Sequence, residues 1–297
     1  MPVSAERLPL EAWGRRWLAG AQAWADRGRW RGYAFEFLMF GIKQGWACLF
    51  GGLMLALLLG TYLFWPQNAP LARYDFLTLG AVAIQVVMLT LKLESWEEAR
   101  VILVFHIVGT VMELFKTAHG SWLYPEPSLL RIGDVPLFSG FMYAAVGSYV
   151  ARIWRIFDIR FTHYPPLWTT WLLAAAIYVN FFTHHWLPDI RAGLFLATAL
   201  LFGRGWFFFT PDRRRRSMPF LLGFFLVALF IWFAENIGTY ARAWSYPDQA
   251  DGWSPVSIAK LGSWFLLMMI SVVLVSLVHR PQPEVQARRT GEIAPSA

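Results

Sequence analysis

The sequence carries little charge for its length. Only 15% of its 297 residues are charged and 57% are hydrophobic, whereas about a quarter of a soluble domain is charged. This composition excludes an ordinary soluble protein and predicts an integral membrane protein. The one cysteine, Cys48, has no partner for an internal disulfide and lies in an apolar run. We interpret it as a lipid-facing or core thiol and expect no redox chemistry.

The chain contains about eight apolar segments long enough to cross a bilayer as helices. They are residues 44–65, 75–92, 98–117, 135–153, 167–186, 190–209, 217–240 and 256–279. No connection between them is long enough to hold a soluble domain. The sequence therefore predicts an all-α polytopic membrane protein with a single transmembrane domain, residues 37–280.

Lysine and arginine are distributed unequally over the connections. With the N-terminus in the cytoplasm, the opposite side keeps only Arg73, Lys116, Arg131, Arg191, Arg242 and Lys260. This bias predicts that both termini are cytoplasmic. The formal net charge of +7 suits anionic headgroups, so membrane lipids are the expected partners and no nucleic acid is invoked.

Both ends of the chain are expected to lie outside the membrane domain. In residues 1–36 arginines interrupt any apolar core, so we expect no cleavable signal peptide. Trp13, Trp17 and Trp24 share one helical face there, which predicts an amphipathic segment on the inner leaflet. Residues 281–297 contain three prolines and are predicted to be a disordered cytoplasmic tail.

One pattern occurs twice. A glutamate in an apolar run, Glu113 or Glu235, is followed nine residues later by Trp122-Leu123-Tyr124-Pro125 or by Trp244-Ser245-Tyr246-Pro247. Both glutamates lie in segments predicted to run outward. The two halves, residues 37–157 and 158–280, are therefore predicted to be parallel four-helix repeats. Equal spacing predicts that the two glutamates superpose, and that the two Trp-x-Tyr exits superpose as well.

Other polar residues gather at the predicted depth of the two glutamates. Ionisable groups are costly in hydrocarbon and should face the bundle interior or a watery cavity. We therefore expect one polar pocket near the extracytoplasmic face. Its candidate substrate-binding residues are Lys116, His119, Trp122, Tyr124, Asn180, Asn236, Trp244, Tyr246 and Lys260.

Glu113, Glu235, His184 and His185 are the candidate catalytic residues of this pocket. A low-dielectric pocket favours the neutral form of a carboxyl, which can then act as a general acid. A histidine could be the base, and aromatic faces could stabilise a carbocation. The alternative for the glutamates is an ion pair or a helix-to-helix hydrogen bond that fixes the two halves, such as Glu113 with Lys116 or Glu235 with Lys260. The alternative for the aromatic exits is an interfacial belt.

The histidines leave several interpretations open. His184 and His185 point about 100° apart on a helix, so they form hydrogen bonds, ligate a metal at a helix end, or do acid–base work. No histidine cluster of the diiron desaturase kind occurs, and no cofactor is assigned. His106 lies two turns from Glu113, roughly 10 Å away, too far to share one metal ion. It is either hydrogen-bonded within the bundle or a proton relay.

Five stretches carry a resemblance to a known family. They are residues 105–116, 120–126, 135–144, 180–185 and 232–239. They resemble a bacterial family of integral membrane proteins catalogued as domain of unknown function 817. The resemblance covers most of residues 35–280. It implies a multi-pass protein of the bacterial cytoplasmic membrane and no assigned activity.

A weaker similarity concerns one arrangement of residues. An acid on a membrane helix, a Trp-x-Tyr exit and a Val-Pro before the next helix are similar to the membrane-embedded carotenoid cyclase and hydratase families. That similarity implies protonation or hydration of isoprenoid double bonds without a metal. Leu137 and Phe138 stand where the cyclases carry an acidic pair, so this chain departs from the cyclase pattern.

Three functions agree with the sequence. The first is a membrane-embedded enzyme or binding site for a lipid or isoprenoid, a hydrophobic small molecule, using the glutamates and histidines for acid–base chemistry. The second is a transporter or proton-coupled channel with a polar site in the outer half of the membrane. A transport path needs polar groups in both leaflets, and the inner half offers only His106 and Gln85. The third is a non-catalytic lipid-binding scaffold.

Overall fold

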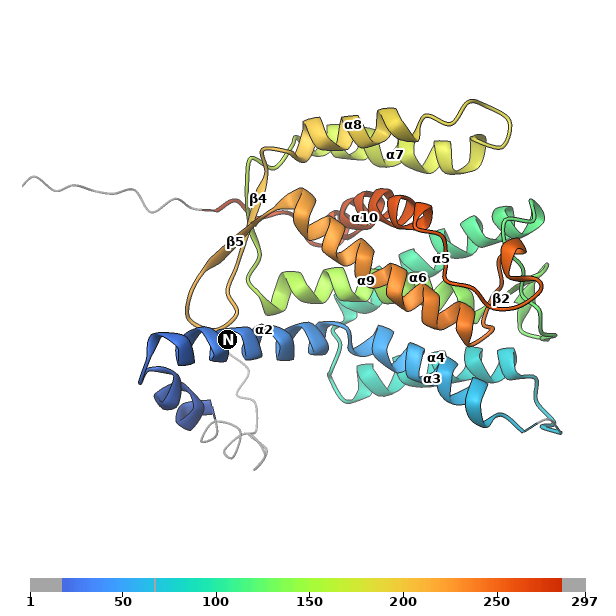
Figure 1. Ribbon diagram of the computed structural model, residues 1–297, viewed down its shortest axis with the longest axis horizontal. Helices are drawn as coiled ribbons and strands as arrows, with labels where there is room; N and C mark the ends of the chain where they lie inside the picture. The colour runs from blue at the N-terminus through green and yellow to red at the C-terminus, as the bar shows by residue number, and fades with distance from the viewer. Residues whose placement is uncertain (1–17, 67, 285–297) are drawn as a thin grey trace, which may run out of the picture.

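The computed structural model describes residues 18–66 and 68–284, and they fold mainly into helices (Figure 1). The helices are α2 (Arg29–Ala47), α3 (Leu49–Phe64), α4 (Arg73–Thr90), α5 (Trp96–Ala118), α6 (Phe138–Ile156), α7 (Leu167–Thr183), α8 (Arg191–Phe202), α9 (Phe220–Tyr240) and α10 (Ala259–Val278). Every predicted span overlaps one of the helices from α3 to α10. The prediction of a mainly helical fold of the membrane type is confirmed.

Four of these helices, α4, α5, α9 and α10, are long and apolar enough to cross a membrane. The bent pair α2 and α3 brings the number to five if it counts as one span. Helices α7 and α8 are apolar but shorter, with 17 and 12 residues. The structure therefore has the helices of a multi-pass membrane protein, and the crossing of all eight segments stays a prediction.

The connections between helices alternate between the two ends of the molecule (Figure 1). At one end, the segments after α5 and α9 meet where Leu123 and Ser245 pair as an antiparallel bridge. The segment after α7 lies at the same end, where its His185 contacts Lys116 of α5. The far end carries the connections from α6 to α7 and from α8 to α9. Acid-bearing helices α5 and α9 therefore run in the same direction.

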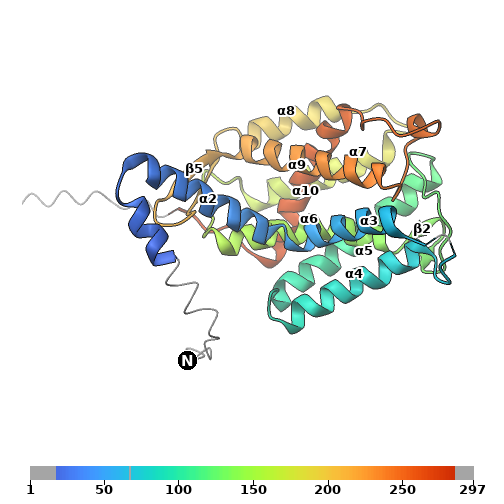
Figure 2. The same ribbon diagram turned by 60° about the horizontal axis from the view of Figure 1, so that its bottom comes forward.

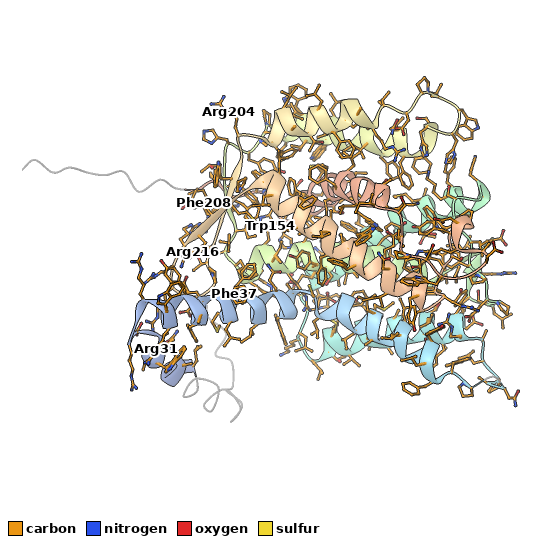
Figure 3. The ribbon with its side chains drawn as sticks, in the orientation of Figure 1. Arg31, Phe37, Trp154, Arg204, Phe208 and Arg216 are labelled. Atoms are coloured by element: carbon orange, nitrogen blue, oxygen red, sulfur yellow. The ribbon has the colours of Figure 1, made fainter. Side chains whose placement is uncertain are left out.

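Short strands, which the sequence analysis did not predict, complete the two ends. They are β1 (Arg131–Ile132), β2 (Val135–Pro136), β3 (Arg160–Thr162), β4 (Trp206–Phe209) and β5 (Arg216–Pro219). The first two form a ribbon, and the other three form an antiparallel sheet in the order β3-β4-β5. Arg204 and Arg216 lie at the end that carries this sheet (Figure 3).

The sheet corrects two predicted spans. The segment 190–209 is helical only to Phe202 and continues as β4, and the segment 217–240 begins in β5. Hydrophobicity alone does not separate a short apolar strand from a helix. The aromatic run Trp206–Phe209 favours a strand because aromatic side chains fit a pleated surface.

Helix α6 lies at the centre of the bundle (Figure 2) and packs against α2, α3, α4, α5 and α10. Helix α10 packs against α9 and α7. The acid of α5 therefore faces α6, and the acid of α9 faces α10. A methyl group added at Gly109 of α5 would lie 2.7 Å from Tyr143 of α6. The missing side chain at Gly109 is thus what lets Tyr143 lie directly against α5.

A buried cluster of charged residues joins helix ends on the side of the molecule away from the bridge between Leu123 and Ser245. Arg152 is fully buried and donates hydrogen bonds to the carbonyl oxygens of Trp46 (3.0 Å) and Leu93 (2.7 Å). Glu94 and Glu98 lie 4.0 Å from its guanidinium. These bonds join the connection between α4 and α5 to the break between α2 and α3, where the two helices bend by 66°. The sequence analysis missed this cluster because its members are distant in the chain.

The ends of the chain differ in part from expectation. Helix α2 begins at Arg29, inside the segment 1–36 that was predicted to lie outside the bundle. Trp13 and Trp17 lie outside the described residues, and Trp24 is 45% exposed. Gln282 and Glu284 form backbone hydrogen bonds with Phe161 of β3, so the disorder predicted from residue 281 is wrong for residues 281–284. Residues 285–297 lie outside the described residues.

Candidate functional site

Glu113 is 4% exposed and accepts three hydrogen bonds. The indole N–H of Trp122 (2.6 Å) and the hydroxyl of Tyr124 (2.7 Å) donate to its Oε2. The hydroxyl of Tyr143 on α6 donates to its Oε1 at 2.8 Å. All three donors are neutral. The carboxyl group is therefore held in one orientation without a basic partner.

Glu235 is bound in a similar way. The hydroxyl of Tyr246 donates to its Oε1, and the indole N–H of Trp264 on α10 donates to its Oε2 at 2.7 Å. Tyr246 is 11 residues after Glu235, as Tyr124 is after Glu113. The donor from the next helix follows 29 residues after Glu235 and 30 after Glu113. Each acid thus has one tyrosine from its own exit and one aromatic donor from the following helix.

The turns that deliver the two tyrosines have the same backbone conformation. Gly120 and Arg242, each seven residues after a glutamate, adopt positive φ angles of 66° and 51°. In both turns the next backbone amide donates a hydrogen bond to the carbonyl five positions earlier, from Ser121 to Lys116 and from Ala243 to Gly238. This is the hydrogen bond of a Schellman helix end. The equal spacing in the sequence therefore encodes an equal helix exit.

The two exits also bind each other. Leu123 and Ser245 occupy equivalent positions in the two patterns, and each backbone amide donates to the other's carbonyl at 2.9 Å. An antiparallel bridge of this kind relates its two strands by a local two-fold axis. The ring of Trp122 lies 6.1 Å from the ring of Tyr246, nearly perpendicular to it. The two acids are therefore parts of one site.

The expected superposition of Trp122 and Trp244 is wrong in one respect. Trp244 donates no hydrogen bond to Glu235 within the described residues, and its ring lies against Gly238, where an added methyl group would be 2.3 Å away. Gly238 follows Glu235 by three residues, and Lys116 follows Glu113 by three. The first half thus carries a long side chain where the second half has room for an indole ring. Trp264 supplies the missing donor to Glu235.

A cavity of about 440 Å³ lies between the two halves and is lined mainly by apolar groups. Both carboxyl groups line it. The other sequence-predicted site residues in its wall are Lys116, Trp122, Tyr124, Asn180, His184, Trp244, Tyr246 and Lys260. Its apolar part reaches α3 and α9, where Gly52 is exposed and Phe230 is 58% exposed. The cavity therefore extends from the polar loops to the lateral surface of the bundle.

The lysines do not pair with the glutamates. The Lys116 ammonium lies 3.4 Å from Nε2 of His184 and 3.0 Å from Nε2 of His185. The Lys260 ammonium lies over the ring of Tyr246, 4.1 Å from its centre. Neither glutamate forms an ion pair with any residue of the described ranges, because every bond to its oxygens comes from a Trp or Tyr. The ion-pair form of the structural alternative is therefore wrong, whereas hydrogen bonds between helices are present, from Tyr143 of α6 to Glu113 and from Trp264 of α10 to Glu235.

The histidine pair ends α7 and faces Lys116. Nδ1 of His184 lies 3.0 Å from the carbonyl oxygen of Asn180. A carbonyl oxygen can only accept a hydrogen bond, so Nδ1 carries the hydrogen and Nε2 is free to accept a hydrogen bond from Lys116. Burial and the neighbouring Lys116 ammonium lower the pKa of His185. These contacts describe hydrogen-bonding histidines. Within residues 18–66 and 68–284, no group of three or more His, Cys, Asp or Glu side chains could hold a metal ion.

Four predicted site residues do not line the cavity. His119 is exposed and stacks on His185. Asn236 binds its own helix at the carbonyl of Trp232 and accepts from the amide of Val256, which fixes the loop before α10. His106 packs against Phe141, and its buried Nδ1 has no hydrogen-bond partner in the described part of the chain. The fourth residue that does not line the cavity is His185. The proton-relay role of His106 stays a prediction.

Sequence reasoning missed three residues of the site. Tyr143 and Trp264 bind the carboxyl groups, and Arg191 lines the cavity. The first two had a signal, because each aromatic donor follows its glutamate by nearly the same number of residues. Arg191 had none, because its position beside the cavity depends on the packing of α8.

Comparison with known proteins places the chain in a family. The family described as "Protein of unknown function (DUF817)" matches residues 36–272. The chain belongs to the DUF817 family. The "Uncharacterized protein YoaT" of Bacillus subtilis (strain 168) is 41% identical over 241 residues, which cover 81% of this chain and 90% of that protein. The DUF817 match includes both glutamates and both exits, so the site lies within the family's region.

Two solved structures show a looser similarity. They are structures of MvINS, a mycobacterial Insig homologue from Mycobacterium vanbaalenii, one of them a cross-linked trimer. Their TM-scores are 0.47 and 0.46 at 15% sequence identity. Each comparison covers 64% of this DUF817 chain and 98% of the other chain.

Proposed function

We propose that this protein holds a lipid or isoprenoid molecule in its central cavity, with Glu113 and Glu235 as proton-exchanging groups beside it. The observation that carries this proposal is that both carboxyl groups line one largely apolar cavity of about 440 Å³. Small-molecule pockets of roughly 300–1,000 Å³ are typically apolar with a few polar groups that orient the ligand. The cavity has both properties.

The lateral reach of the cavity favours a ligand that comes from the bilayer. Its wall includes Gly51 and Gly52 of α3 and Phe230 of α9. Gly52 has open space around its Cα, since a Cβ there would meet no atom within 4 Å. An apolar chain can therefore enter between α3 and α9 without crossing the polar loops. A water-soluble substrate has no such need for a lateral opening.

The hydrogen bonds of the two acids suit proton exchange. A tyrosine hydroxyl can donate or accept, so Tyr143 and Tyr246 can each receive a hydrogen bond from a protonated carboxyl. The indole N–H groups of Trp122 and Trp264 can only donate and keep the other oxygen in place. Each carboxyl can thus gain or lose a proton while its position is preserved. The rings of the exits could stabilise positive charge that develops on an isoprenoid.

The parallel repeat and the orientation belong to this proposal. The repeat is supported by the equal exits of α5 and α9 and by the bridge between Leu123 and Ser245. The orientation, with both termini in the cytoplasm of a bacterium, is supported by the arginines near the β3-β4-β5 sheet, such as Arg204 and Arg216 (Figure 3). In that orientation the two acids lie in the outer half of the membrane.

A transport function has less support. In the proposed orientation the cluster around Arg152 would lie in the inner half, where the sequence offered only His106 and Gln85. None of its members lines the cavity, however, and Arg152 is committed to the carbonyls of Trp46 and Leu93. A polar path that connects the two clusters would need side chains between them, and His106 makes no side-chain hydrogen bond in the described residues.

The test is lipid extraction and mass spectrometry of the purified protein, with elemental analysis of the same sample. We expect one lipid or isoprenoid species far above its share in the bulk membrane. Gly52→Phe, which fills the lateral part of the cavity, should lose this species. Gly60→Phe is the matched control, because Gly60 lies on the same helix, has no atom within 4 Å of an added Cβ and does not line the cavity. Identical bulk-lipid extracts from all three proteins would contradict the proposal.

The acid–base role needs a second comparison. Cells that produce the wild type are compared with cells that produce the Glu113→Gln and Glu235→Gln double variant. If the glutamates act chemically, the bound species should change and a lipid should appear only with the wild type. If both proteins retain the same species and the cell lipids are identical, the protein is a non-catalytic lipid-binding scaffold.

A further inference from the structure

The cavity wall carries more positive than negative side chains that remain available to a ligand. Lys116, Lys260 and Arg191 line it together with the two glutamates. We propose that the cavity selects an amphiphile with an anionic headgroup, an oxyanion such as a phosphate or carboxylate at the end of an apolar chain. Lys116 and Lys260 would hold that headgroup. This inference rests on the proposed function, because it assumes that the cavity takes a lipid-like molecule.

Each oxygen of the two glutamates already accepts at least one hydrogen bond. Trp122, Tyr124 and Tyr143 supply three donors to Glu113, and Tyr246 and Trp264 supply two to Glu235. All of these donors are neutral side chains, and neither lysine is among them. The positive charges of Lys116 and Lys260 are therefore not neutralised by direct contact with a glutamate. Positive charge that is partly removed from water is unfavourable unless an anion pairs with it.

Lys260 is the clearest case. Its ammonium lies 4.1 Å from the ring centre of Tyr246 and 5.3 Å from that of Trp122. Within the described residues no oxygen or nitrogen accepts a hydrogen bond from it. An ammonium has three N–H donors, and two aromatic faces satisfy none of them as an acceptor oxygen would. The donors of Lys260 are therefore available to a ligand in the cavity.

Lys116 faces the cavity from the other half. It is 4% exposed, and its ammonium contacts ring nitrogens of His184 and His185 and no carboxylate. Two histidines leave one of its three N–H groups for a ligand. Arg191, at the mouth, is bound to Asp189 at 2.5 Å and contributes less free charge. The headgroup site is thus formed by one lysine from α5 and one from α10.

The rest of the cavity fits the chain of such a molecule. Away from the lysines the wall consists of small and apolar residues, among them Gly51, Val227 and Phe230. The headgroup therefore lies near the two glutamates, and the chain extends between α3, α6 and α9 toward the lateral surface. A free inorganic anion would leave this apolar part unfilled.

The experiment compares two ligands that differ only in the headgroup. Wild-type protein in detergent is titrated with decyl phosphate and with decanol, and bound ligand is counted by native mass spectrometry. Hydrogen bonds to a charged group make us expect at least roughly tenfold tighter binding of decyl phosphate. Lys260→Met should abolish most of this preference, and Lys260→Arg should retain it. Lys92→Met is the control, because Lys92 is exposed and lies outside the cavity.

Each outcome decides a different point. Equal binding of the two ligands by the wild type overturns the headgroup inference and leaves the proposed function intact. Binding of neither ligand overturns the proposed function, and the headgroup inference with it. Competition by inorganic phosphate at the same concentration as decyl phosphate overturns the requirement for a chain. If Lys260→Met fails to fold, Lys116→Met takes its place, and its preference for decyl phosphate over decanol is compared with that of the wild type. An unchanged preference in Lys116→Met overturns the role of Lys116 in binding the headgroup.

Discussion

Replacing each glutamate by glutamine and by leucine tests whether the carboxyl groups are held as neutral hydrogen-bond acceptors. In Glu113→Gln the amide oxygen can accept from Trp122 and Tyr124, while the amide NH₂ can donate to the hydroxyl of Tyr143. All three hydrogen bonds are kept. We therefore expect a change within about 1 kcal/mol in the free energy of unfolding, since a neutral hydrogen bond contributes roughly 1 kcal/mol.

Glu113→Leu removes the acceptor for all three donors. At about 1 kcal/mol for each lost bond, the destabilisation is about 3 kcal/mol. Glu235→Leu removes the acceptor for two donors, Tyr246 and Trp264, so we expect about 2 kcal/mol by the same rule. For a chain of this size each kcal/mol lowers the melting temperature by roughly 2–4 °C. The expected shifts are about 6–12 °C for Glu113→Leu and about 4–8 °C for Glu235→Leu.

The assay is thermal unfolding of the purified variants in one detergent, followed by tryptophan fluorescence. Glu97→Leu is the control, because Glu97 is exposed in the first turn of α5 and its loss should cost no more than about 1 kcal/mol. If glutamine destabilises as much as leucine, the reasoning is refuted, because a negative charge is then what holds the donors. Recovery of stability by adding Lys116→Met or Lys260→Met would further show that the charge pairs with a lysine.

Three more predictions concern the surroundings of the site. Gly238→Ala should displace the ring of Trp244 and cost about 1–3 kcal/mol, whereas Gly52→Ala, with open space at its Cα, should leave the melting temperature nearly unchanged. Arg152→Met should cost about 3–5 kcal/mol because it leaves the buried carboxyl group of Glu94 without a cation, whereas Glu98 keeps its ion pair with Arg155; a melting curve that matches the wild type would contradict this role of Arg152. Because the pKa of His185 is lower in the folded protein, the histidine binds a proton more readily in the unfolded chain, and stability should fall as the pH drops below the ordinary histidine value of 6.5. His185→Asn should flatten the melting temperature in this pH range. A pH profile that is the same in the variant and the wild type would refute the prediction.

The sequence by itself determined the features that depend on local patterns. Hydrophobic content and the length of the apolar runs predicted a membrane protein and the approximate positions of its helices, because a helix in lipid must be apolar over about 20 residues. The spacing from each glutamate to its tyrosine is also local. It is set by one helix end and one turn, and those turns at Gly120 and Arg242 have the same backbone form. The sequence analysis predicted from this spacing that the two exits superpose, and the structure adds that each tyrosine donates a hydrogen bond to its own glutamate, Tyr124 to Glu113 and Tyr246 to Glu235.

Features that join distant segments were decided only by the tertiary structure. Whether Trp244 or Trp264 reaches Glu235 depends on which side chain fits against Gly238 and on how α10 is rotated beside α9. The same holds for Lys116. It contacts the histidines at the end of α7 and forms no ion pair with Glu113, three residues before it in the chain. The charges and spacing of residues on one helix do not determine which residues of a neighbouring helix they contact. Two nearby side chains of opposite charge on one helix can each bind a different partner. Packing selects the partner, and it therefore decided which groups of the site are satisfied and which remain available to a ligand.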